Sequence, residues 1–153
     1  MSKVTTYIKA ILIPLLVGTV VGLLTSNSMP EFNMLNKPFF SPPGILFPIV
    51  WTILYTLMGV SYGILDTKNL VDSEINSIYY WQLAVNALWS IIFFILKLRL
   101  FAFFWIILLI ILVITMILRF YNKNRTAGLL QIPYLIWLVF AAILNLSIFI
   151  LNA

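Results

Sequence analysis

Long apolar segments alternate with short polar or proline-rich segments along the whole chain, and this pattern predicts five membrane-spanning helices. An apolar segment of about 20 residues can cross a hydrocarbon core of about 30 Å. We therefore expect an all-α membrane protein, a five-helix transmembrane bundle in which residues 1–153 form a single domain. The predicted spans are Tyr7–Leu24, Gly44–Leu65, Ile75–Leu96, Leu100–Leu118 and Ala127–Leu151.

The first apolar segment has a second interpretation, because a basic start followed by a short apolar region also resembles a secretory signal. Its cleavage pattern is poor, so we interpret it as a retained span. The same span contains Gly18 and Gly22 in a G-x-x-x-G arrangement, which lets another helix approach closely. Packing inside the bundle is favoured over dimerisation through this motif.

A proline-rich loop, Ser26–Pro43, separates the first two predicted spans. Pro38, Pro42 and Pro43 lack backbone donors and push the preceding residue towards extended geometry, so this part of the loop cannot be regular helix. The loop is also too apolar for a plain solvated linker. It either lies in the headgroup region or folds as a lid over one end of the bundle, and the prolines favour the lid because they limit its motion.

Three of the predicted spans carry a stripe that mixes aromatic rings with hydroxyl or amide groups. Spacings of three and four residues place the members of each stripe on one helix face. Amides at membrane depth need partners, so they should face the bundle interior, as interhelical hydrogen bonds or as ligand contacts. The stripes predict an aromatic cavity, with a packed interior as the alternative. They are Trp51, Tyr55, Met58 and Tyr62; Gln82, Asn86, Trp89 and Phe93; and Tyr134, Trp137, Ala141 and Asn145.

The fourth predicted span, Leu100–Leu118, has almost no polar feature. We interpret it as the helix most exposed to lipid. The charged residues between the spans predict an orientation, because cytoplasmic loops carry the larger share of Lys and Arg. Six basic residues on one side against three on the other favour an N-terminus inside and a C-terminus outside. The first set is Lys3, Lys9, Lys68, Arg119, Lys123 and Arg125; the second is Lys37, Lys97 and Arg99.

Composition narrows the possible chemistry. The chain is 63% hydrophobic and 8% charged, with no cysteine and no histidine. Disulfides, thiolate metal ligands, the usual haem ligand and the usual general base are therefore missing, and no cofactor is expected. No ionisable residue lies in the middle of a span, so ion-coupled transport and ordinary acid–base catalysis are disfavoured. The net charge of +5 is scattered, so it does not indicate nucleic-acid binding.

Three sequence blocks resemble the signature of the TspO/MBR family. The first runs from Lys37 to Pro43 and continues from Phe47 to Gly59. The second is Gln82–Phe94 and the third is Pro133–Asn145. Members of this family are called tryptophan-rich sensory proteins in bacteria and translocator proteins, or peripheral benzodiazepine receptors, in mitochondria. The resemblance covers essentially the whole chain, and the combination of the three blocks is specific.

The resemblance implies a five-helix bundle, often a homodimer, with a pocket beneath the first loop. It implies binding of porphyrins such as protoporphyrin IX and haem, of benzodiazepine-like drugs, and of sterols in some members. Trp51 and Trp137 match the pocket tryptophans of the family, and Asn86, Phe93 and Ala141 match pocket-wall positions. The candidate ligand-binding residues are Phe32, Pro42, Pro43, Phe47, Trp51, Tyr55, Asn86, Trp89, Phe93, Trp137, Ala141 and Asn145.

Our leading hypothesis is a binder of tetrapyrroles in a bacterial cell membrane, with a sensory or regulatory role. The alternatives are light-dependent porphyrin degradation through Trp51 and Trp137, transport of tetrapyrroles or sterols, and a purely structural bundle. Two departures from the family pattern matter. Phe40 stands where many members have tryptophan, and Ile148–Ala153 lacks the tyrosine and the basic residue of the sterol-recognition element in animal members.

Overall fold

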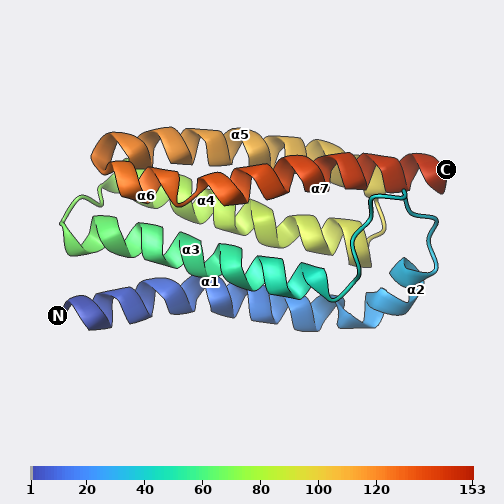
Figure 1. The fold of residues 1–153 in the computed structure, drawn as a ribbon, viewed down its shortest axis with the longest axis horizontal. Coiled ribbons are helices and arrows are strands. Elements are labelled where there is room, and N and C mark those ends of the chain that lie inside the picture. The colour runs from blue at the N-terminus through green and yellow to red at the C-terminus, as the bar shows by residue number, and fades with distance from the viewer. Residues whose placement is uncertain (1) are drawn as a thin grey trace.

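The structure, a computed structural model, describes residues 2–153, and within this range it contains helices and no strand. Five helical segments are long and apolar enough to cross a membrane, which confirms an all-α integral membrane protein. The long helices lie side by side, and the two termini lie at opposite ends of the bundle (Figure 1). These helices are α1 (Lys3–Thr25), α3 (Leu46–Thr67), α4 (Ser73–Ser90), α5 (Arg99–Lys123) and α7 (Ile132–Leu151).

Short helical segments extend or interrupt this pattern. The turn η1 (Ser26–Ser28) and the helix α2 (Met29–Asn33) continue α1 into the loop. The π-helical segment η2 (Ile91–Ile95) ends the third span, and the Leu96 amide donates to the Ile91 carbonyl across five residues, at 3.0 Å. The sequence pattern alone did not indicate this widened turn.

The fifth predicted span is two helices rather than one. A short helix, α6 (Arg125–Leu129), is separated from α7 by a turn at Leu130 and Gln131. Pro133 occupies the first turn of α7, where its missing N–H would be unsatisfied in any case. A proline at this position cannot donate back into α6, so the helix restarts there.

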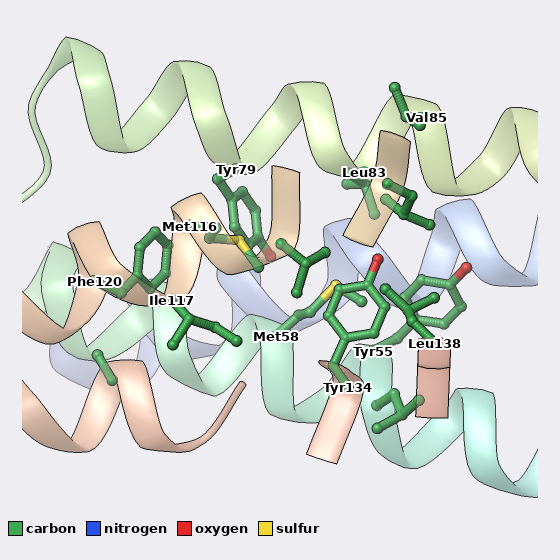
Figure 2. Packing of buried hydrophobic residues seen from close by; sticks show 14 of the residues in the cluster. Tyr55, Met58, Tyr79, Leu83, Val85, Met116, Ile117, Phe120, Tyr134 and Leu138 are labelled. Carbon is green, nitrogen blue, oxygen red and sulfur yellow. The ribbon is translucent and has the colours of Figure 1, made fainter. Parts of the chain in front are cut away.

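The interior is densely packed at the end of the bundle away from the loop. Met58, Leu65, Tyr79, Met116 and Phe120 are each 1% exposed or less. Figure 2 shows Tyr79, Met116 and Phe120 together in one part of this cluster, and Tyr55, Tyr134 and Leu138 in another. Within a bilayer this burial stabilises the bundle through close packing, because lipid tails are as apolar as the side chains and supply no hydrophobic driving force between helices.

The prediction that the fourth span is the most exposed helix is wrong. A smaller share of the first span is buried, 17% against 33% for α5. Every third or fourth residue of α5 is buried, because this helix packs against both α4 and α7, whereas α1 packs mainly against α3. The inward and outward faces of α5 are equally apolar, so hydropathy did not distinguish them.

The proline-rich loop lies across one end of the bundle, from α2 to the end of α7 and back to the start of α3 (Figure 1). Two contacts hold it there. The Asn36 amide donates to Asn152 Oδ1 at 3.0 Å, and Asn152 Nδ2 donates to the Asn36 carbonyl at 2.8 Å. Arg99 at the start of α5 donates to both carboxylate oxygens of Glu31, at 3.0 and 2.8 Å. This arrangement agrees with the lid interpretation of the loop.

Candidate functional site

A cavity of about 770 Å³ lies beneath the loop, between α1, α3, α7 and the end of the third span. Its lining includes four exposed residues of α1 and α3, namely Thr19, Gly22, Pro48 and Thr52. The cavity is therefore not fully enclosed along these two helices.

Most of the predicted ligand-binding residues are brought together around this cavity. The loop contributes one aromatic ring, α3 contributes three, the third span contributes two, and α7 contributes one ring together with a small residue and an amide. Those predicted residues that line the cavity are Phe32, Phe47, Trp51, Tyr55, Trp89, Phe93, Trp137, Ala141 and Asn145.

The aromatic rings of the cavity wall contact one another and so hold one another in place. Trp89 stacks on Phe93 with ring centroids 5.2 Å apart. Trp137 meets Phe47 edge to face at 5.9 Å, and Trp51 lies 5.5 Å from Tyr55. Such pairs favour offset and edge geometries and contribute about 0.5–1.5 kcal/mol each beyond their buried area. The wall is therefore largely pre-formed.

The widened turn η2 places two adjacent phenylalanines on the cavity side. Phe93 and Phe94 both line the cavity, and Phe32 of the loop meets them at centroid distances of 6.0 and 5.2 Å. π-helical turns occur frequently at functional sites, where they redirect side chains. Here the turn brings the rings of Phe93 and Phe94 into contact with the Phe32 ring of the loop.

A chain of polar contacts joins the cavity wall to the loop. Trp89 Nε1 donates to Asn145 Oδ1 at 3.0 Å, and Asn145 Nδ2 donates to the Arg99 carbonyl at 2.8 Å. The Arg99 guanidinium, only 10% exposed, forms the two hydrogen bonds to Glu31 of α2. Directly bonded groups therefore connect Trp89 in the cavity wall to Glu31 in the loop.

A second chain of polar contacts runs from Tyr55 of the cavity wall into the interior. Tyr55 donates its hydroxyl hydrogen to Asn86 Oδ1 at 2.7 Å, and Asn86 Nδ2 donates to the Tyr134 hydroxyl at 2.6 Å. The Tyr134 hydroxyl donates in turn to Gln82 Oε1 at 2.8 Å. Asn86 therefore lies behind Tyr55 and does not line the cavity, which corrects the pocket-wall position that the family resemblance implied. Both ends of its amide are already used between helices.

Pro42 and Pro43 lie elsewhere as well. They line a second, smaller cavity of about 410 Å³ inside the loop region, and not the larger one. The two cavities share Phe32 and Phe47, so they are neighbours. Phe40 lies outside both cavities and contacts Phe140 edge to face at 6.3 Å, so an aromatic contact is kept where many family members have tryptophan.

The contribution of α1 to the cavity was missed by sequence reasoning. Gly18, Thr19 and Gly22 all line it, together with Thr25 at the end of the helix. The signal was present in the G-x-x-x-G spacing, which we interpreted as a packing motif. A Cβ on Gly18 would lie 2.5 Å from the Tyr55 ring, so packing explains this glycine, but a Cβ on Gly22 would meet no atom within 4 Å.

The chemical repertoire of this site is that of a binding pocket. Among residues 2–153, no cluster of histidine, cysteine, aspartate or glutamate could hold a metal ion. Trp137 Nε1 is buried and has no hydrogen-bond partner within the described part of the chain. The arrangement can enclose a flat apolar molecule and give it a few directed polar contacts.

Known proteins resemble this chain over almost its full length. Residues 10–151 match the sequence profile of the TspO/MBR family. The chain is 39% identical over 148 residues to the tryptophan-rich protein TspO of Archaeoglobus fulgidus, covering 95% of this chain and 96% of that protein. It is 36% identical to the protein of the same name in Chlorobaculum tepidum, covering 86% and 89%. It is 35% identical to the tryptophan-rich sensory protein of Cereibacter sphaeroides, covering 79% and 76%.

Proposed function

The chain belongs to the TspO/MBR family, and we propose that it binds porphyrins and related tetrapyrroles within the membrane and has a sensory or regulatory role. The names of its relatives support a membrane sensory or translocator role. The observation that carries the proposal is the cavity of about 770 Å³ lined by aromatic rings from the loop, α3, the third span and α7.

The size and surface of the cavity suit a flat ring system. Small-molecule sites usually measure about 300–1,000 Å³ and are lined mainly by apolar and aromatic groups with a few polar anchors. The rings of Trp51, Trp89 and Trp137 supply stacking and edge contacts, and Trp137 Nε1 supplies an unused donor. Benzodiazepine-like drugs are flat and aromatic as well, so we propose that they compete for the same space.

A sensory role needs a link between the bound ligand and a surface that can change. The chain from Trp89 through Asn145 and Arg99 to Glu31 supports such a link, because it begins in the cavity wall and ends in the loop. We propose that a ligand stacked against Trp89 shifts this chain and so alters the position of the loop.

The test is a titration of the purified protein with protoporphyrin IX, followed by the visible absorption of the porphyrin. The double variant Trp51→Leu and Trp137→Leu should bind about 10-fold more weakly or worse, because two ring contacts of about 0.5–1.5 kcal/mol each are lost. Trp81→Leu is the matched control, since Trp81 is 65% exposed and does not line the cavity. Unchanged affinity in a folded double variant would contradict the proposal.

Light-dependent degradation of the bound porphyrin is a second candidate function. It is favoured by one observation: two indole rings, those of Trp51 and Trp137, line the same cavity, where they could be oxidised by an excited porphyrin and oxygen. Illumination of the protein with protoporphyrin IX should then give a new absorbing product. Bleaching at the rate of free porphyrin would eliminate this function and leave the binding proposal intact.

We also propose a membrane setting for this function: a homodimer in a bacterial cell membrane, with the N-terminus inside and the C-terminus outside. The distribution of basic residues supports the orientation. The chain has no cysteine, so single cysteines at Ser2 and Ala153 can be labelled from outside without interference. Labelling at position 2 and not at position 153 in intact cells would reverse the proposed orientation.

A further inference from the structure

The smaller cavity has a different character from the larger one. It measures about 410 Å³ and is formed largely by the proline-rich segment, with Pro38, Pro42 and Pro43 on its wall. It shares Phe32, Asn33, Gly44 and Phe47 with the larger cavity. The rings of Phe32 and Phe47, which line both spaces, meet edge to face at 6.5 Å. The two cavities therefore lie next to the same aromatic pair.

A cation lines this smaller cavity without an acidic partner. Lys37 Nζ donates to the Asn33 carbonyl at 3.2 Å and reaches the Leu35 carbonyl at 3.5 Å, and it lies 4.9 Å from the centre of the Phe32 ring. Among residues 2–153, no carboxylate lies within 4.0 Å of it, and the nearby Glu31 is paired with Arg99. The ammonium group therefore contacts backbone carbonyls and an aromatic ring instead of a carboxylate.

Ser41 lines the same cavity. Its hydroxyl oxygen, Oγ, is buried and makes no hydrogen bond to any of residues 2–153. Buried polar groups are nearly always hydrogen-bonded, so each exception calls for a physical explanation. A serine hydroxyl and a lysine ammonium are both donors that can bind a carboxylate, whose two oxygens accept charge-assisted hydrogen bonds.

We infer that Lys37 and Ser41 bind a carboxylate of the tetrapyrrole whose ring occupies the larger cavity. This inference rests on the proposed function, since it requires the ring to lie among the tryptophans. It follows from a division of the two spaces: the larger one is walled by flat rings, and the lining of the smaller one includes the cation Lys37 and the hydroxyl residue Ser41. Acidic tetrapyrroles have this two-part chemistry, with a flat apolar ring that bears carboxylate side chains.

The inference is tested by comparing protoporphyrin IX with its dimethyl ester, which has the same ring and no negative charge. The wild-type protein should bind the free acid about 10-fold more tightly or better, as expected when a charge-assisted contact is available to one ligand alone. Lys37→Met should lower the affinity for the acid to that for the ester and leave the ester unchanged. Ser41→Ala should remove part of the difference, and Lys68→Met, at the other end of the bundle, should change neither ligand.

Each outcome separates this inference from the proposed function. If neither compound binds the wild-type protein, the proposed function fails and the carboxylate site fails with it. If both bind equally well, or if the preference for the acid persists in Lys37→Met, the carboxylate site is overturned while the aromatic cavity stands. Lys37 lies in the loop and is half-buried, so its variant should fold; Ser41→Ala provides an independent readout, in which an unchanged preference would also count against the site.

Discussion

At the end of the bundle away from the loop, Tyr79 and Phe120 stack with ring centroids 6.0 Å apart, and neither is more than 1% exposed. At the loop end, Trp51, Trp89 and Trp137 stand around a cavity of about 770 Å³. Both ends are built from aromatic rings, amides and glycines on the same helices. The helices therefore carry the same kinds of residue at both ends. The two ends differ in whether the space facing the rings is filled by other side chains or left as a cavity.

Glycines of the long helices show this difference most clearly. In the packed half, a Cβ on Gly59 would lie 2.4 Å from Ile11 Cα, and a Cβ on Gly63 would lie 2.6 Å from the Tyr7 ring. In the loop half, Gly22 faces open space. The first two glycines let α1 and α3 come together, and the third leaves room where the helices enclose a cavity. Gly59 and Gly63 thus let the helices close at one end of the bundle, whereas Gly22 leaves space at the other.

The largest effect on stability is expected from Gly59→Ala. The added Cβ would collide with backbone atoms of α1, which cannot move aside as a side chain can, so the two helices must separate. Overpacking of this kind costs about 1–3 kcal/mol. Gly22→Ala is the matched control, and it should be neutral or stabilise by up to about 1 kcal/mol, since alanine is the better helix former. Thermal unfolding in detergent measures both, and equal midpoints for the two variants would contradict the comparison.

A larger residue at Gly22 should reduce binding without reducing stability. Leucine at this position would extend into space beside the cavity that Gly22 lines. We expect protoporphyrin IX to bind about 10-fold more weakly to Gly22→Leu, which corresponds to about 1.4 kcal/mol. The midpoint of thermal unfolding should stay at or above that of the wild type. Gly22→Ala should keep the wild-type affinity. A loss of affinity in this variant as well would contradict the prediction, because it would mean that binding needs the backbone freedom of glycine and not the space beside it.

The stripes show how far the sequence could predict these two ends. Helical spacing correctly grouped Trp51 with Tyr55, and Trp89 with Phe93, because residues three or four apart share a face. It could not tell that Met58 and Gln82, further along the same stripes, lie in the packed half, each fully buried. Periodicity predicts which face of a helix a residue lies on. It does not predict where along the bundle the packed interior ends and the cavity begins, because that depends on tertiary contacts.

Three further features escaped the sequence for identifiable reasons. The position of Asn86 depends on Tyr55 and Tyr134, which occupy both ends of its amide, and no spacing rule gives such partners. The widened turn at Ile91–Ile95 has no marker in an apolar run. The break before α7 did have one, since Pro133 stands at the start of the helix, but the apolar pattern continued through it.

The ion pairs at the two ends should differ in strength. The Glu31–Arg99 pair is bidentate, with side chains 34% and 10% exposed, whereas the Glu74–Arg119 pair at the other end is 70% and 44% exposed. Glu31→Gln should lower stability by about 1 kcal/mol, because a partly buried guanidinium loses a charged acceptor. Glu74→Gln should change it by less than about 0.5 kcal/mol, as for most exposed pairs. The midpoints of thermal unfolding of the two variants measure this difference in stability. The rate of porphyrin dissociation should increase only in Glu31→Gln.

The smallest effect is expected from Asp72, at the packed end. Its carboxylate caps α4 by accepting from the Ile75 amide at 2.9 Å and pairs with Lys123 Nζ at 2.8 Å. The pKa of Asp72 is lowered below its ordinary value, mainly by the hydrogen bond from Lys123. The hydrogen bond from the Ile75 amide lowers this pKa further. Because the pKa is depressed in the folded protein, this stabilisation is fully present above the ordinary pKa of about 4 and is lost as the pH falls through the lower folded value.

Asp72→Asn isolates the charge, because asparagine caps a helix about as well as aspartate. The variant should unfold at a slightly lower temperature than the wild type at pH 6, and the difference should shrink as the pH falls below about 4. The carboxylate is exposed and screened, so the effect should remain the smallest of the set, and salt should reduce it further. A difference that stays constant from pH 6 to pH 3 would mean that the side chain acts through the cap alone and that Lys123 contributes nothing to the packed end.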